Sequence, residues 1–240
     1  MSNIKLVHSG GNSVSLTTPD SNPAANRTFK LPGADGTPGQ AMVTDGSGAL
    51  SFATVGGVTT GGLIETITGQ CDGRVVVGAS GNYTLENVTA HQNTTDTFTD
   101  LTGSSITYTP PTGTKKVVYR FSVYHSATAY SGIAYMKLLV DGTEVTQGRE
   151  VISYDYSAYA HSVSRLSFEY TFITDASSED VANGKFTSWS SGKTLKYQTR
   201  RHGNSYTATF HKIKYWESGG GSGAATNEVK VPMLTIQSFA

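Results

Sequence analysis

The sequence contains a single cysteine, and only 15% of its residues are charged. One cysteine cannot build a disulfide framework within the chain, so we interpret Cys71 as a small buried residue. Eighteen basic residues balance eighteen acidic ones, which leaves no global field to attract nucleic acid or an anionic membrane. No apolar run reaches the length of a transmembrane helix, and the first residues lack the charged and apolar regions of a secretory signal. We therefore expect neither nucleic-acid binding nor membrane insertion.

Motifs of catalysis and metal binding are also missing. The chain has no His-x-x-x-His, no paired cysteines and no phosphate-cradling glycine loop that leads into a helix. His202 and His211 flank a predicted hairpin and would come close to each other across it, but a metal centre needs more ligands than these two. We interpret both as solvated or interface histidines. The sequence thus predicts no catalytic residues, no metal and no cofactor, in a protein that is not an enzyme.

What the chain does contain favours strands. Its 240 residues include 27 glycines, and threonine and tyrosine are abundant. Such a composition is typical of many short strands joined by glycine turns. The length allows one domain of about 150 residues with its own core and a thinner N-terminal part.

Three strand pairs with glycine-rich reversals are spaced roughly 35 residues apart, which suggests a crude internal repeat. In the clearest pair, residues 41–44 and 49–53 flank Asp45-Gly46-Ser47-Gly48, and an Asp-Gly reversal is a strong hairpin signal. The other two pairs join residues 6–8 to 13–17 and residues 75–77 to 82–85. None has enough apolar side chains to bury a face alone. Each must pack on something else, most economically on copies of itself.

The segment LPGADGTPGQAMVTDGSGALSFA, preceded by NPAANRTFK, contains the second of these hairpins. It resembles the short modules near the N-termini of tailed-bacteriophage fibre and spike proteins, which carry a TPGQ and TDGSG pattern and trimerise through interleaved strands. The resemblance covers about the first quarter of the chain. It implies a phage virion protein, assembled in the host cytoplasm and released by lysis. The expected protein is a short homotrimeric fibre or spike that attaches to the host and docks on other tail or capsid proteins through its N-terminal region.

Two alternatives remain beside the fibre hypothesis. A trimeric capsid decoration (cement) protein, or a head-fibre protein, would use the same module to serve the particle. A depolymerase that cuts surface polysaccharide usually needs a long β-helix with paired carboxylates, for which the chain is too short. The residues expected to anchor and trimerise the N-terminal module are Leu6, Val14, Leu16, Phe29, Leu31, Met42, Val43, Leu50 and Phe52.

Longer strands are expected from about Ser104 onward. Apolar residues alternate with polar ones at odd positions 117–123 and at even positions 166–172, as in a sheet with one buried face. Asp141-Gly142 predicts a further hairpin. The strand that starts at Tyr206 slips in phase before Ile213, as a bulge would cause. With residues 193–201 and 229–239, this makes about seven or eight strands.

The predicted fold is all-β, with an extended, intertwined β-hairpin segment followed by a trimeric, jelly-roll-like β-sandwich. Residues 1–62 would form the anchoring and trimerisation hairpins. Residues 63–103 would form a connecting β segment, and residues 104–240 would form the sandwich head that contacts the host.

Two surface features suggest how such a head would bind a host glycan or protein. Antibody paratopes use tyrosines among small polar residues, and this pattern occurs in a segment whose expected contact residues are Tyr154, Tyr156, Tyr159 and His161, together with Tyr130. The alternative is that these tyrosines pack in the trimer interface or beneath a loop. A basic patch at residues 196–202 would meet acidic glycans, or would form a solvated strand edge whose charge prevents edge-to-edge pairing.

Overall fold

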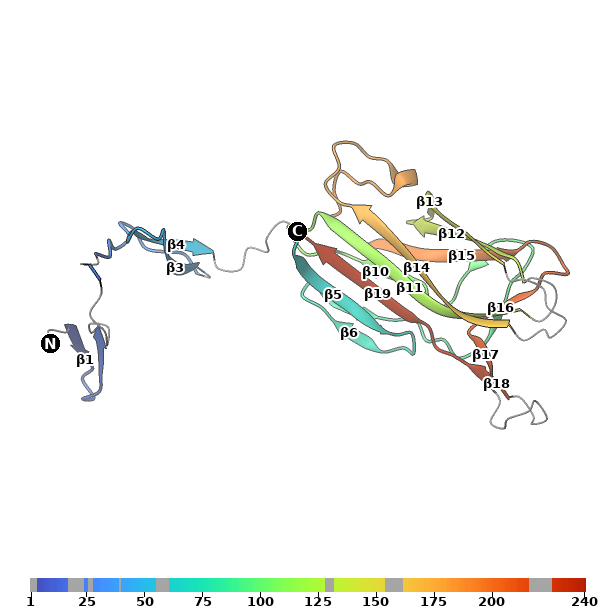
Figure 1. Cartoon of the computed structure of the whole chain (residues 1–240), viewed down its shortest axis with the longest axis horizontal. Helices are drawn as coiled ribbons and strands as arrows, with labels where there is room; N and C mark the ends of the chain where they lie inside the picture. The colour runs from blue at the N-terminus through green and yellow to red at the C-terminus, as the bar shows by residue number, and fades with distance from the viewer. Residues whose placement is uncertain are drawn as a thin grey trace. The chain divides into compact units, whose positions relative to one another are not determined.

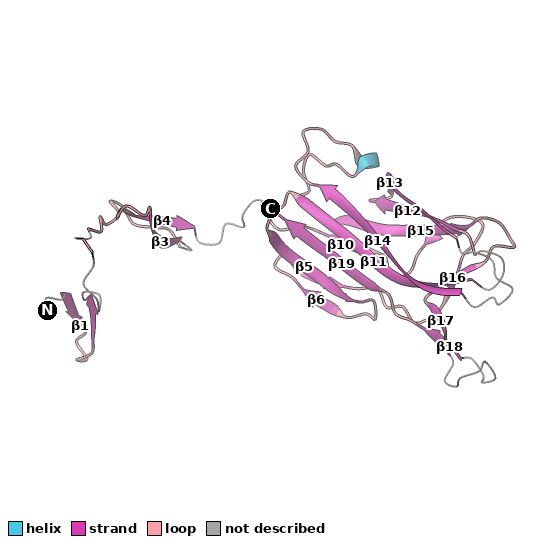
Figure 2. Ribbon diagram, in the orientation of Figure 1, coloured by secondary structure: helices cyan, strands magenta, loops and turns pink. Residues whose placement is uncertain are grey.

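The computed structural model describes residues 4–16, 24–25, 28–38, 40–54, 61–127, 132–153, 162–215 and 226–240. The chain divides into two compact units, Met1–Gly57 and Val58–Ala240. In the described part, strands dominate (Figures 1 and 2), and the helical element is a single 3-10 turn at Val181–Asn183. No helix found there is long and apolar enough to cross a membrane. The all-β prediction is confirmed.

The first unit consists of two of the three predicted hairpins. Strand β1 (Ile4–Val7) pairs with β2 (Ser13–Leu16), and β3 (Gln40–Thr44) pairs with β4 (Leu50–Thr54). Asp45 closes the second hairpin, because its carboxylate accepts hydrogen bonds from the Ser47 hydroxyl at 2.6 Å and from the Ala49 backbone N–H at 3.0 Å. The Ser47 hydroxyl is the main reason why the pKa of Asp45 is lowered.

The second unit contains two antiparallel sheets built mainly from eight strands (Figure 1). One sheet has the order β5 (Leu63–Gln70), β19 (Met233–Phe239), β11 (Lys116–Ala127) and β14 (Ser162–Ile173). The other has the order β10 (Ile106–Tyr108), β15 (Lys193–Arg201), β12 (Ala134–Val140) and β13 (Thr143–Ile152).

The pairing of these eight strands is that of a jelly roll. Along the chain, the first strand pairs with the last, the second with the seventh, the third with the sixth and the fourth with the fifth. These pairs form one long antiparallel ribbon. The ribbon is rolled up, because β19 also pairs with β11 and β15 also pairs with β12. The predicted jelly-roll-like β-sandwich is therefore confirmed.

Short additional strands lie in two of the segments that connect the strands of the sandwich. Between β5 and β10 lie the third predicted hairpin, β6 (Val75–Val77) with β7 (Asn82–Thr84), and the strands β8 (Gln92–Asn93) and β9 (Thr99–Asp100). Between β15 and β19 lie β16 (Ala208–Phe210), β17 (Lys212–Tyr215) and β18 (Thr226–Val229). His211, with a φ of 61°, separates β16 from β17 and accounts for the predicted slip in phase.

Residues 63–103 are more than the connecting segment that the sequence suggested. Strand β5 is the first strand of the jelly roll, and Ile67, Leu85 and Leu101 are almost completely buried in its core. The compact unit accordingly begins at Val58 rather than at Ser104. The sequence missed this because the buried positions of β5 are Glu65 and Ile67, and the carboxylate interrupts the apolar alternation.

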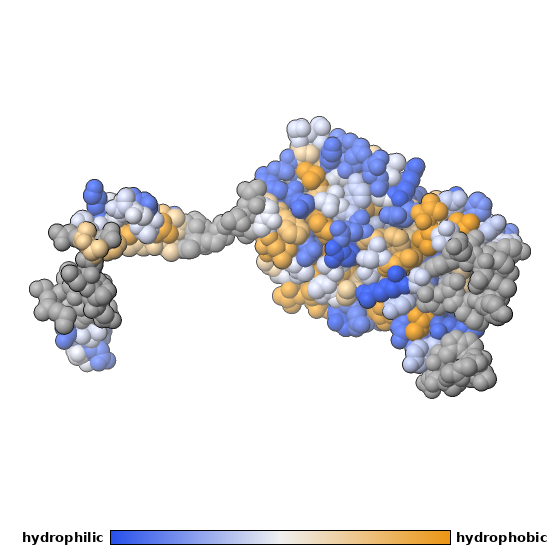
Figure 3. All heavy atoms as spheres, viewed as in Figure 1, coloured by the Kyte–Doolittle hydropathy of each residue, from blue (hydrophilic) through white to orange (hydrophobic). Residues whose placement is uncertain are grey.

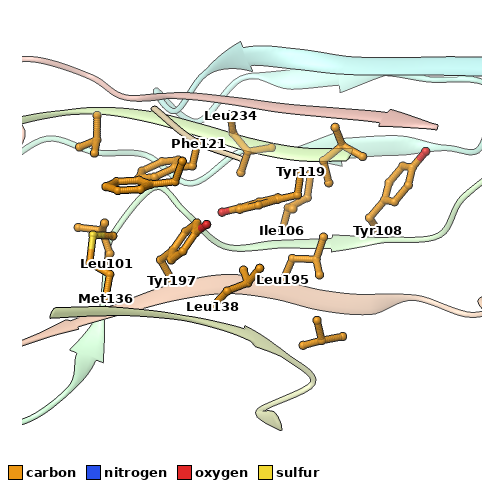
Figure 4. Close-up of a cluster of buried hydrophobic side chains, with 14 of the residues drawn as sticks. Leu101, Ile106, Tyr108, Tyr119, Phe121, Met136, Leu138, Leu195, Tyr197 and Leu234 are labelled. Carbon is orange, nitrogen blue, oxygen red and sulfur yellow. The ribbon is translucent and has the colours of Figure 1, made fainter. Parts of the chain in front are cut away.

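The core lies between the two sheets, as Figure 4 shows. Tyr119 and Phe121 from β11 meet Leu195 and Tyr197 from β15, and all four side chains are at most 1% exposed. The rings of Tyr119 and Tyr197 lie 5.8 Å apart between centroids. The predicted inward positions on residues 117–123 and 166–172 are confirmed, with Leu166 and Tyr170 partly rather than fully buried.

The buried Glu65 and Cys71 both have hydrogen-bond partners. The buried carboxylate of Glu65 accepts hydrogen bonds from the hydroxyl of Ser80 at 2.6 Å and of Tyr108 at 2.7 Å. Cys71 is buried, as predicted, and its thiol donates to the carbonyl of Gly103. Burial raises the pKa of Cys71 to about 12, which makes it unreactive.

Candidate functional site

A row of aromatic and cationic side chains crosses the outer face of the sheet that contains β12, β13 and β15. It consists of Phe98, Arg200 and Tyr135 and is called the Arg200 row below. Alternate residues of β15, including Tyr197 and Thr199, point into the core, so Arg200 points outward. Arg200 is directly opposite Tyr135 on β12. On its other side, β9 pairs Thr99 with Thr199, which places the preceding residue, Phe98, beside Arg200. The sheet thus positions one guanidinium between two aromatic rings.

The distances show a stacked arrangement. The Arg200 Cζ atom is 4.4 Å from the ring centroid of Tyr135 and 5.3 Å from that of Phe98. The Lys137 Nζ atom lies 4.5 Å from the same Phe98 centroid. Such stacking occupies the flat faces of the guanidinium and leaves its in-plane N–H groups as donors. One of them, at Nη1, donates to the carbonyl of Arg201 at 3.1 Å.

The row continues beyond β15. The Tyr135 hydroxyl forms a hydrogen bond of 2.9 Å with Nδ1 of His202. The His202 ring packs edge-on against Tyr206, with centroids 5.1 Å apart. These contacts fix the orientation of the Tyr135 ring on which Arg200 is stacked.

A bulge in β13 forms the wall of the site. On β12, Met136 pairs with Glu150 of β13, but Leu138 pairs with Val145. Four residues of β13, 146–149, therefore lie opposite the single residue Lys137. Bulges of this kind re-aim side chains. Gly148 permits it, because a Cβ atom there would lie 2.8 Å from the Cβ of Leu138.

Within this wall, the Arg149 Nε atom donates to Glu144 Oε1 at 2.5 Å. The hydrogen bond is the largest reason why the pKa of Glu144 is lowered, and the charge of Lys137 contributes. Glu144 is therefore ionised and neutralised by Arg149 at neutral pH.

The row and the bulge enclose an open pocket of about 280 Å³. Phe98, Tyr135 and Val151 provide apolar walls, and the charged lining consists of Lys137, Arg149, Arg200, Glu144 and Glu150. Arg149 and Glu144 form an ion pair, which leaves Lys137 and Arg200 as the cations of the pocket. An aromatic surface beside a charged donor can hold a ligand that has both an apolar face and an anionic group.

Arg200 differs from most other arginines in the described part of the chain. Arg74, Arg120, Arg149 and Arg201 are each within ion-pair distance of a carboxylate. For Arg200 and for Arg165, no such carboxylate is found among the residues that the structure describes. Arg165 lies on the outer face of the opposite sheet, in a separate hollow with Tyr124 and Lys230.

The basic residues of the predicted patch at residues 196–202 therefore have different environments. Lys196 forms an ion pair with Asp100, and Arg201 with Asp96, while Arg200 remains in the pocket. The strand-edge interpretation is wrong, because β15 is paired on both sides, with β12 on one and with β9 and β10 on the other.

The two histidines that were expected near each other have different environments. His202 contacts Tyr135 at the surface of the sheet. His211 is fully buried, and burial lowers its pKa to about 4. The interpretation of His211 as a solvated or interface residue is therefore wrong. No group of three or more metal-ligating His, Cys, Asp or Glu residues occurs in the residues for which the structure gives positions.

The predicted tyrosine contacts, Tyr130, Tyr154, Tyr156, Tyr159 and His161, lie outside the described residues. The strands that they connect end together, since Ala127 pairs with Ser162 and Ala134 pairs with both Ile152 and Arg201. The Arg200 row is close to this end of the sandwich.

Four of the nine predicted anchoring residues are exposed in the single chain, and Figure 3 shows apolar residues on the surface of the first unit. The exposed ones are Leu6, Phe29, Leu31 and Met42, at 50 to 76% of their full area. Val43, Leu50 and Phe52 are partly buried, and the Phe52 ring packs against Gly36. The side chains of Val14 and Leu16 lie outside the description. The anchoring role of all these residues stays a prediction.

Sequence reasoning missed Phe98, Tyr135 and Lys137. The outward positions of Tyr135 and Lys137 follow from the Asp141-Gly142 hairpin, so alternation offered a signal for them. Their meeting with residues 98 and 200 depends on pairings of distant strands, for which the sequence gives no local signal.

Comparisons with known proteins identify no family. No protein-family model and no curated protein matches the chain. Among solved structures, a sugar-binding protein described as the EclA C-terminal domain is 11% identical, with a TM-score of 0.29, over 56% of this chain and 84% of that one. Infectious bursal disease virus is similar at TM-scores of 0.33 (Gt strain, 10% identity, 96% of this chain) and 0.32 (Gx strain, 12% identity, 79% of this chain).

The chain spans only 48% and 38% of the two viral chains that it matches. Likenesses with scores this low carry no functional argument. The all-β jelly-roll architecture rests on the strand pairing of the chain itself.

Proposed function

We propose that the chain is a structural protein of a tailed-bacteriophage virion, a short homotrimeric fibre or spike whose second unit binds carbohydrate on the host surface. The TPGQ and TDGSG hairpin, closed by Asp45, supports the virion assignment through its resemblance to fibre modules. The exposed apolar side chains of the first unit support association with two further copies and with other virion proteins.

The observation that carries the binding role is the pocket in which Arg200 is stacked between Phe98 and Tyr135. Jelly rolls are common in both viral capsid and lectin domains, but a fold does not determine a function. The site does more to support carbohydrate binding than the fold does. Aromatic walls accept the C–H face of a sugar, and charged side chains accept or donate hydrogen bonds to its substituents.

The test uses the full-length chain, labelled with a fluorophore and added to cells of the host. We expect saturable binding, competition with phage adsorption, and loss of binding after periodate oxidation of the surface polysaccharide. Absence of binding to cells, together with labelling of the capsid surface by antibodies against the chain, would contradict the fibre proposal and favour a decoration protein.

A further inference from the structure

We infer that the pocket around Arg200 binds a saccharide that carries one negatively charged group, a carboxylate or a phosphate. This inference deepens the proposed carbohydrate-binding function and rests on it. The alternative for the same pocket is a neutral sugar, and the two cations Arg200 and Lys137 argue against it.

Arg200 is prepared for an oxyanion before any ligand arrives. The rings of Phe98 and Tyr135 hold its guanidinium in place, so little side-chain entropy remains to be lost on binding. A stacked guanidinium has lost hydration from its faces, while its edge still offers parallel N–H donors to a carboxylate or phosphate. A neutral hydroxyl would satisfy this edge only partly.

Lys137 adds a second positive charge on the same side of the pocket. Its Nζ atom lies over Phe98, the ring that also contacts Arg200. One anionic group placed between the two cations would contact both. Arg149 is not available in the same way, because it is bound to Glu144.

The charges that remain in the pocket suit one anionic group. Because Arg149 binds Glu144, Lys137 and Arg200 are the cations that are left for a ligand.

The size of the pocket agrees with a single ring. Its volume of about 280 Å³ is just below the lower limit of about 300 Å³ that is usual for pockets that hold larger ligands. Phe98, Tyr135 and Val151 supply the apolar surface for the ring, and the neighbouring sugars of a glycan would extend into solvent.

The first experiment compares sugars that differ only in charge. The probes are galacturonate with galactose, glucuronate with glucose, and galactose 6-phosphate and glucose 6-phosphate as the phosphate arm, titrated into the ¹⁵N-labelled full-length chain and followed by NMR. We expect at least one anionic sugar to bind about tenfold or more tightly than its neutral counterpart. The arm that binds identifies a carboxylate or a phosphate as the anion. Equal affinity of charged and neutral sugars, or no binding of any of them, would overturn the inference.

The second experiment locates the site with matched variants. Arg200→Gln should weaken binding of the anionic sugar about tenfold or more, whereas Arg165→Gln, which removes the comparable arginine of the opposite sheet, should change it less than about twofold. Thermal unfolding of each variant checks that the fold is retained, and Arg200→Lys, which keeps the charge without the planar stack, gives an intermediate loss. If Arg165→Gln abolishes binding and Arg200→Gln does not, the inference is wrong.

The same variants separate this inference from the proposed function. If the wild-type chain competes with phage adsorption and the Arg200→Gln chain competes equally well, the attachment role stands and the assignment of the pocket fails. If the wild-type chain binds an anionic sugar through Arg200 but never binds cells, the pocket assignment stands and the attachment role fails.

Discussion

Phe121 is fully buried at the centre of the sandwich, in a cross-strand row with Phe168 and Leu234. Truncation of Phe121 to alanine leaves a cavity that neighbouring strands cannot fill. We expect a loss of about 3 to 5 kcal/mol in the free energy of unfolding, measured by urea denaturation of the full chain. Phe98→Ala, at the surface of the same unit, is the control and should cost much less. A loss below about 1 kcal/mol for Phe121→Ala would show that the residue contributes little to the core.

Two buried histidines should make the stability of the fold depend on pH. His125 and His211 are fully buried, and burial lowers the pKa of each to about 4. The unfolded chain binds a proton at these side chains near pH 6.5, while the folded chain does not. The contribution of the two neutral histidines to the free energy of unfolding is therefore fully present above about pH 6.5 and is lost as the pH falls toward about 4.

We expect each histidine to remove up to about 3 kcal/mol of stability across this interval, measured by urea denaturation at pH 7 and pH 4.5. The double variant His125→Gln, His211→Asn should reduce the slope, and asparagine tolerates the left-handed backbone of position 211. Carboxylates such as Asp72, whose pKa is lowered to about 2 by its hydrogen bond to Arg74, act at lower pH. An unchanged slope in the double variant would refute the assignment to the histidines.

Among the strands, the bulge of β13 depends on one glycine. Gly148→Ala places a Cβ atom against the Cβ of Leu138, at 2.8 Å before any adjustment, and close to the carbonyl of Val145. Strand β13 must move, so we expect a loss of about 1 to 3 kcal/mol and weaker binding in the Arg200 pocket. Gly33→Ala, where an added Cβ meets nothing within 4 Å, is the control. Full stability of Gly148→Ala would mean that the bulge adapts without strain.

The elements that the sequence predicted well are those defined by neighbouring residues. Asp141 and Gly142 both have positive φ, at 49° and 81°, which is the geometry that an Asp-Gly hairpin turn requires. Alternation located the inward face of β11 because each of its buried residues has a polar neighbour in sequence. The charged residues of β15 misled the edge interpretation, because each of Lys196 and Arg201 is neutralised by an aspartate from a distant segment.

Most of the candidate site could not be predicted from the sequence. Arg200 was recognised as part of a basic patch, but its proposed binding role depends on Phe98 and Tyr135, which reach it through two separate strand pairings. The pocket also needs a bulge whose position follows from packing against Leu138 rather than from a turn motif. Such information resides in the tertiary structure.

For the whole molecule, we expect a trimer. All buried hydrophobic residues of the described chain belong to the second unit, so we expect the hairpins of the first unit to pack on partner chains. Sedimentation equilibrium should give three times the chain mass of 25.4 kDa. Leu31→Glu should weaken association, whereas Val77→Glu, at the same exposure of 76% but in the second unit, should not. A stable, fully folded monomer would refute both the trimer and the fibre proposal.

The pairing of the first jelly-roll strand with the last one has a consequence for biosynthesis. Thr68 on β5 and Thr235 on β19 share a hydrogen bond although they are 167 residues apart. Contacts between residues so far apart in sequence form slowly, because the chain loses the entropy of the intervening loop before the contact provides any stabilisation. Until β19 has been synthesised, β5 has no partner, and β11 lacks its neighbour on one edge. Exposed edges of this kind invite pairing with other nascent chains. Folding of the sandwich therefore has to wait until β19 has been synthesised, and a chaperone that shields these edges would raise the yield of folded protein.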